Sequence, residues 1–314
     1  MAEPGSGVHT DLSDLGGDAW RHAFFAAGRD GGFHEPLGPY HDAVCVVGGD
    51  SLVVTFEVDS RIEDVATDNA PRGWIMARDE GWSTLTLLSR GETWYRDSAV
   101  YDFFDRMTDG GFFEEFERVL FYGAGSAGYA AAAFSVAAPG SRVVALRPQA
   151  TLDARTAGWD PRYRAHRRVS FEDRYGYAPD MLEAADAGYV LYDPAEDEDA
   201  MHAALFRKPN VTRLPCPQLG WNLDRNLHGM DILAPMMRHA MAGDLTEARF
   251  WALMRARRTH APYLRSLLTR LEDSGRLELA KRVCRHAITK TPRPHFRKRL
   301  AALEDREAAW TAAQ

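Results

Sequence analysis

Residues 118–148 decide the fold, and they read RVLFYGAGSAGYAAAAFSVAAPGSRVVALRP. An apolar run at 119–122 enters a tight turn built from glycine, alanine and serine. A helix of small residues at 129–138 follows, Pro139 and Gly140 end it, and a second apolar run begins at Val143. Apolar strands on both sides of a helix suit a parallel sheet that is covered on both faces. This stretch therefore predicts a strand–helix–strand unit.

Strand-like and helical segments alternate on both sides of this unit. Apolar or β-branched runs lie at 43–47, 52–56 and 82–88 before it, and at 188–192 and 211–214 after it. Helical spacing occupies 100–116, with a break at Gly110 and Gly111, and returns after each later strand. The pattern predicts an α/β fold with a mostly parallel, doubly wound sheet and a small all-α appendage at its C-terminal end.

Composition sets limits on the class of protein. The chain has 314 residues, 45% of them hydrophobic, and a net charge of −7, so its bulk charge does not suit a nucleic-acid binder. No apolar run approaches the roughly 18–20 residues of a membrane helix. The opening MAEPGSGVHTDLSDLGG lacks the basic and apolar regions of a secretory signal, and the three cysteines are far apart. We expect a cytoplasmic protein without a membrane span, a disulfide framework or a metal site.

Three segments are predicted along the chain. Residues 1–40, with seven glycines before Gly38, suggest an irregular lead-in; 41–243 form the α/β domain; and 244–314 form a basic helical appendage. Between Arg249 and Arg299 there are fifteen Lys or Arg residues and three acidic residues. Helices at 262–273 and 277–290 resemble one tetratricopeptide unit. This segment could bind a protein or an anionic partner, whereas its few aromatic residues make sequence-specific nucleic-acid binding unexpected.

The glycine turn fits two chemistries. Its string GAGSAG matches the G-x-G-x-x-G of dinucleotide sites, through Gly123, Gly125 and Gly128. In such sites the glycines let the backbone approach a pyrophosphate at a helix N-terminus. The acidic residue that usually binds the ribose is replaced by Arg147, which could bind the 2′-phosphate of NADP. An NADP-dependent oxidoreductase is therefore one alternative.

The same turn also fits the G-x-S-x-G pattern of a serine nucleophile, with Ser126 at its apex and Ala124 and Gly128 two positions away. A serine hydroxyl needs a neighbouring imidazole as base, and the imidazole needs a carboxylate that orients it. His228 follows the last predicted strand. Asp193 ends the strand before it, and Asp199 is a second candidate acid or a helix N-cap. Ser, Asp and His follow in the order expected on such a sheet.

With these residues the chain resembles the α/β-hydrolase superfamily over residues 43–242. The resemblance implies a serine hydrolase without a cofactor, acting on an ester or amide of a small-molecule or polymer-attached acyl substrate. It implies Ser126 as nucleophile, His228 as base, and the backbone N–H of Ala127 as one oxyanion donor. The second donor would come from the loop around Val58, where Glu57 and Asp59 are unfavourable neighbours. A degenerate hydrolase fold that acts as a binding or assembly module is the other alternative.

Overall fold

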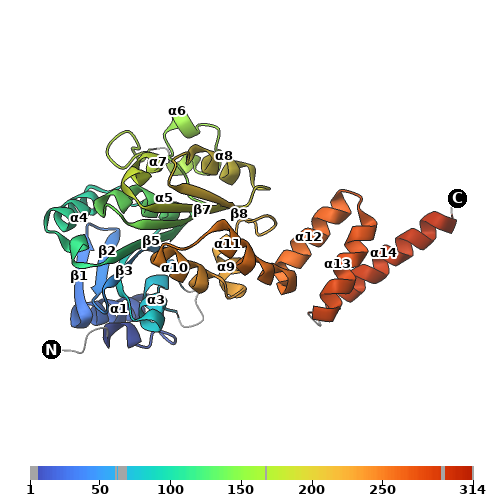
Figure 1. Ribbon diagram of the computed structural model, residues 1–314, viewed down its shortest axis with the longest axis horizontal. Helices are drawn as coiled ribbons and strands as arrows, with labels where there is room; N and C mark the ends of the chain where they lie inside the picture. Colours follow the sequence, from blue (N-terminus) through green and yellow to red (C-terminus); the bar gives the residue numbers. More distant parts are fainter. Residues whose placement is uncertain (1–5, 61, 63–68, 167, 291–293, 313–314) are drawn as a thin grey trace.

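The computed structural model describes residues 6–312 except 61, 63–68, 167 and 291–293. Figure 1 shows an α/β body from which the C-terminal helices extend to one side. Eight strands form one sheet. They are β1 (Gly32–Leu37), β2 (His41–Val46), β3 (Ser51–Val58), β4 (Ser83–Ser89), β5 (Arg118–Ala124), β6 (Arg142–Leu146), β7 (Ala187–Tyr192) and β8 (Val211–Pro215).

The strand order is β1-β2-β4-β3-β5-β6-β7-β8. Strand β2 runs antiparallel to both β1 and β4, and the six strands from β4 to β8 in this order are parallel to their neighbours. The prediction of a mostly parallel α/β sheet of α/β-hydrolase type is confirmed. Strands β2 and β3 follow each other in sequence, but β4 lies between them, so the turn that joins them does not close a hairpin.

Helices cover both faces of the sheet. Alternate residues of β3, β5 and β6 belong to different clusters: Val54, Phe121 and Val143 pack with α5, whereas Val53, Leu120 and Val144 pack with α10. The α-helices of the body are α1 (Gly17–Gly31), α3 (Arg72–Glu80), α4 (Ser98–Asp109), α5 (Ser126–Phe134), α6 (Ala154–Ala157), α7 (Ala178–Met181), α8 (Asp197–Leu205), α9 (Leu223–Gly229), α10 (Leu233–Ala242) and α11 (Glu247–Leu253).

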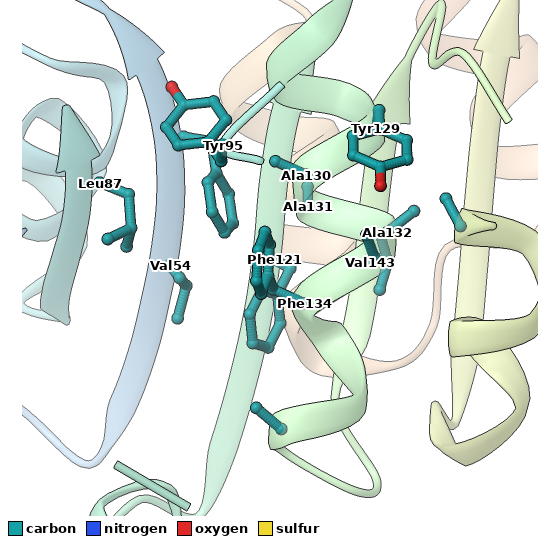
Figure 2. Packing of buried hydrophobic residues seen from close by; sticks show 14 of the residues in the cluster. Val54, Leu87, Tyr95, Phe121, Tyr129, Ala130, Ala131, Ala132, Phe134 and Val143 are labelled. Carbon is teal, nitrogen blue, oxygen red and sulfur yellow. The ribbon is translucent and has the colours of Figure 1, made fainter. Parts of the chain in front are cut away.

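Helix α5 explains why the segment after the glycine turn is rich in alanine. Its alanines from Ala130 to Ala133 are fully buried, and Phe134 lies within stacking distance of Phe104 and Phe56. Figure 2 shows this helix packed beside Phe121 and Val143. Small side chains let the helix axis approach the sheet closely, and the large aromatic rings fill the space at its end. No cofactor is needed to account for this composition.

The N-terminal segment differs from the predicted irregular lead-in. Residues 17–31 form α1, and β1 then pairs with β2 at the edge of the sheet. Trp20, Phe24 and Ala27 are buried on one side of α1 and pack against Val44 and its neighbours. The glycines misled the prediction because several of them allow close packing: a Cβ at Gly28 would meet the Val44 side chain at 2.4 Å.

The C-terminal helices form an all-α appendage that consists of α12 (Ala261–Asp273), α13 (Leu277–Lys290) and α14 (Pro294–Ala312). The two predicted helices around Ser274 and Gly275 are confirmed; the resemblance to a tetratricopeptide unit stays a prediction. Its core is a separate cluster that begins at Ala261. Phe250 and Met254 belong instead to the cluster of the body, so the packing boundary lies near residue 260 rather than at 244. None of the described helices is long and apolar enough to cross a membrane.

Candidate functional site

The candidate site is a pocket at the carboxyl end of the sheet. Between β3 and β5 the chain changes direction, because β3 continues through α3 to β4 on one side and β5 through α5 to β6 on the other. Ligands of open α/β sheets bind at such a switch point. A pocket of about 180 Å³ lies there, lined by Phe56, Glu57, Val58, Ile62, Ala70, Arg72, Tyr122, Ala124, Ala127, Arg147, Trp221, Asn222, Asp224 and Arg225.

The glycine turn beside this pocket has its strained residue at Gly125. Its φ is 65° and its ψ is −123°, a conformation that residues with a side chain rarely adopt. In a G-x-S-x-G turn the nucleophile itself sits on the sharp, strained corner, which exposes its oxygen. The predicted strand–turn–helix is confirmed, but its apex is Gly125. Ser126 already belongs to α5.

Close backbone packing supports the same assignment of the apex. A Cβ at Gly123 would lie 2.1 Å from the carbonyl oxygen of Ala127. The two positions that approach each other are thus 123 and 127, which are symmetric about residue 125. With this register, the N–H that follows the apex belongs to Ser126, whereas the prediction assigned the oxyanion donor to Ala127.

Ser126 is 3% exposed, and its hydroxyl donates to the carboxylate of Glu92 in the loop after β4. His228 lies in α9, not in a loop as the sequence suggested, and its Nδ1 accepts from the guanidinium of Arg72. The hydrogen bonds described for Ser126 and His228 are therefore with Glu92 and Arg72. The catalytic roles of Ser126 and His228 stay predictions.

Asp193 is placed as predicted, directly after β7, and it is buried. Its two carboxylate oxygens accept from the backbone N–H of Ala195 at 2.9 Å and of Gly220 at 2.7 Å. The second bond holds the β8–α9 loop, and the next residue of that loop, Trp221, lines the pocket. Trp221 thus lies in the loop that Asp193 anchors, and its ring stacks on Arg147.

Asp199 takes part in a different, buried network. It is the third residue of α8, so the N-cap interpretation is wrong, and its carboxylate pairs with Arg162 at 2.7 Å and with Arg147 at 3.5 Å. Arg162 also binds Asp160. Buried carboxylates need such partners to remain charged. Asp199 therefore fixes Arg147, the residue that follows β6, and it does not face His228 in any described contact.

Arg147 enters the pocket from a strained position. Its φ is 48°, although it is not a glycine, and its guanidinium lies 4.8 Å from the centre of the Trp221 ring. Strain of this kind costs of order 1–3 kcal/mol and persists where the surroundings enforce it. Stacking occupies the face of the guanidinium and leaves N–H groups at its edge.

Two acidic residues flank Val58, the last residue of β3, and they behave differently. Asp59 does not line the pocket and pairs with Arg21 at 2.5 Å. Glu57 lines the pocket, and its burial raises the pKa of the carboxyl to about 7, against the opposing effect of Arg72. Val58, the predicted source of the second oxyanion donor, also lines the pocket.

Tyr122 is a pocket residue that the sequence interpretation missed, because a tyrosine inside an apolar run resembles any core residue. It is 2% exposed, and its hydroxyl has no hydrogen-bond partner among the residues that the structure describes. Burial raises the pKa of this hydroxyl well above its usual value, so it stays protonated. Within the described residues no group of three or more His, Cys, Asp or Glu is arranged to hold a metal ion.

Comparison with known proteins gives structural matches alone. No protein-family model and no curated protein matches the chain. A glycosylation-associated protein complex from Streptococcus agalactiae matches with a TM-score of 0.44 and 11% identity, over 69% of this chain and 47% of that one. An esterase from Pyrobaculum calidifontis matches with a TM-score of 0.44 and 16% identity, over 68% of this chain and 87% of the esterase. The fluorophosphonate-binding serine hydrolase F of Staphylococcus aureus matches with a TM-score of 0.42 and 9% identity, over 68% of this chain and 96% of that hydrolase.

This chain spans less than half of the Streptococcus protein's length. The class of the molecule is defined by its own sheet: eight mostly parallel strands with helices on both faces, in an α/β-hydrolase-type fold that carries an all-α appendage. In this site, glycine occupies the strained corner of the turn between β5 and α5.

Proposed function

We propose that this protein is a binding module built on a hydrolase fold, in which the catalytic centre has become a ligand pocket. The observation that carries the proposal is Gly125 at the strained corner of the β5–α5 turn. A glycine there offers no nucleophile. The hydroxyl of the neighbouring Ser126 donates a hydrogen bond to a carboxylate, that of Glu92.

The loop after β8 supports the same proposal. A serine nucleophile depends on an imidazole that is held by a carboxylate. Asp193 retains the position of that carboxylate, but its oxygens hold backbone N–H groups and Trp221 lines the pocket beside it. In this proposal the corner of the turn has lost its nucleophile, and Asp193 remains because it anchors a loop.

A fluorophosphonate probe followed by peptide mass spectrometry tests the proposal. We expect no adduct on the folded wild-type protein. Gly125→Ser combined with Trp221→His returns a nucleophile and an imidazole next to Asp193, and we expect this variant to gain an adduct at position 125. The matched control adds Ser126→Ala to this variant and should retain the adduct. An adduct at Ser126 of the wild type, lost in Ser126→Ala, would overturn the proposal in favour of a serine hydrolase.

A further inference from the structure

We propose that the pocket binds the phosphate group of a small molecule, at the N-terminus of α5 between Tyr122 and Arg147. This inference rests on the proposed function, because a pocket without a nucleophile holds its ligand unchanged. It names the chemical class of that ligand. Three kinds of donor converge on the pocket, and each comes from a different element.

The first donor is the start of α5. This helix has nine residues, and its N-cap is Gly125, which has no side chain that could cap it. The Glu92 carboxylate accepts from the side chain of its first residue, Ser126. The first N–H groups of a helix have no acceptor within the helix, and the helix dipole favours an anion at this end. Ala124 and Ala127, on either side of the cap, both line the pocket. Because Gly125 has no Cβ, an anion can approach this backbone closely.

The second donor is the Tyr122 hydroxyl. A buried hydroxyl without a partner costs free energy, so such a group is usually satisfied by a water molecule, an ion or a ligand. Tyr122 lies near the carboxyl end of β5, three residues before Gly125, and its side chain lines the same pocket. This unsatisfied group points to a ligand that accepts a hydrogen bond.

The third donor is cationic. Arg147 reaches the pocket from the end of β6, and Arg72 from the start of α3. Guanidinium groups are well matched to phosphate oxygens. Glu57 and Asp224 also line the pocket, and their charges limit the net positive potential. A phosphate has enough oxygens to accept from backbone, hydroxyl and guanidinium at once, which a neutral ligand of this size does not.

Isothermal titration calorimetry with inorganic phosphate, at pH 6.5 and constant ionic strength set with chloride, tests the site. We expect saturable binding to the full chain at one site. Tyr122→Phe removes one hydrogen bond to a charged ligand, so the affinity should fall by about tenfold or more. The melting temperature of the free variant should not fall, because the lost hydroxyl has no partner.

Tyr189→Phe is the matched control, since Tyr189 packs in the same cluster, two strands away from Tyr122, and does not line the pocket. It should bind phosphate as the wild type does. Competition with glycerol 3-phosphate and with NADP then tells a simple phosphomonoester from a nucleotide; displacement by either one supports the site. Absent phosphate binding, or equal affinity in Tyr122→Phe and wild type, overturns the inference. If phosphate does not bind and the wild-type protein forms no fluorophosphonate adduct, the proposed function survives and this inference alone fails.

Discussion

At the scale of single residues, the pocket combines groups that burial holds in unusual states. The carboxyl of Glu57 accepts from the backbone N–H of Gly73 at 3.3 Å, and Arg72, Thr55 and Tyr122 are the groups that interact with it electrostatically or by hydrogen bonding. Desolvation outweighs these favourable contacts and raises the pKa of Glu57 from 4.5 to about 7. The protonated carboxyl is thus the form that the folded protein prefers below about pH 7.

This shift predicts a pH-dependent stability. Because the folded-state pKa of Glu57 exceeds the unfolded one, its contribution is fully present below about pH 4.5 and is lost as the pH rises through about 7. Between pH 5.5 and 8 the wild type should lose up to about 2 kcal/mol more unfolding free energy than Glu57→Gln. Urea unfolding of both proteins at the two pH values measures this. Parallel pH profiles would contradict it.

The affinity of the pocket for phosphate should depend on the ionisation of Glu57. Ionised Glu57 places a negative charge in the pocket, so the affinity of the wild type for phosphate should fall between pH 6 and 8. Glu57→Gln should remove most of that fall, whereas the second ionisation of phosphate itself acts on both proteins equally. Calorimetry of the two proteins at both pH values provides the comparison.

At the scale of elements, the turn between β5 and α5 sets the chemistry through its register. The corner residue is determined by the close contact between Gly123 and the carbonyl of Ala127. Because that contact is backbone against backbone, the turn cannot slip by one residue to bring Ser126 to the corner without a steric clash. The same contact explains why a glycine is required at position 123, independently of any ligand.

Gly123→Ala should therefore destabilise the protein by about 1–3 kcal/mol or more, as overpacking does in a well-packed region. Gly229→Ala is a suitable control, since an added Cβ there meets only the His260 side chain, at 3.2 Å. It should change the free energy of unfolding by less than about 1 kcal/mol. Chemical denaturation of the two variants checks both values. Equal stabilities would contradict the packing argument.

At the scale of the whole molecule, the sheet has separate clusters on its two faces and the appendage has one of its own. The junction is the segment between α10 and α12. Phe250 and Met254 in this segment are buried in the body, and His260 contacts Asn226 of α9 at 3.0 Å. The basic residues that follow belong to helices whose own ion pairs include Arg299 with Glu272.

Two truncations distinguish the segment that packs on the body from the helices of the appendage. A chain that ends at residue 260 should keep a stability close to that of the body in the full protein. A chain that ends at residue 243 loses the burial of Phe250 and Met254 and should be less stable by about 3–6 kcal/mol. Thermal and urea unfolding of the two proteins provide the measurement. Equal stability of both truncations would place the boundary at 244 after all.

The sequence by itself determined the elements and their class. Strand periodicity, the alanine-rich helix and the stop at Pro139 are local signals, so the α/β sheet, α4, α5 and the helices around Gly275 could be predicted. Asp193 at the end of its strand was also accessible, because a residue that ends a strand lies at the edge of the sheet. The string GAGSAG indicated a functional turn but fitted several registers equally well.

Only the tertiary structure decided which residue occupies the corner of that turn. The contact of Gly123 with Ala127 and the left-handed φ of Gly125 are properties of the packed backbone, and no residue pattern contains them. Which side chains meet at the pocket was decided in the same way. Tyr122, Arg72 and Trp221 are far apart in the sequence, and the crossing of the chain between β3 and β5 brings them together. Local pattern determines secondary structure, whereas register and burial depend on contacts between distant segments.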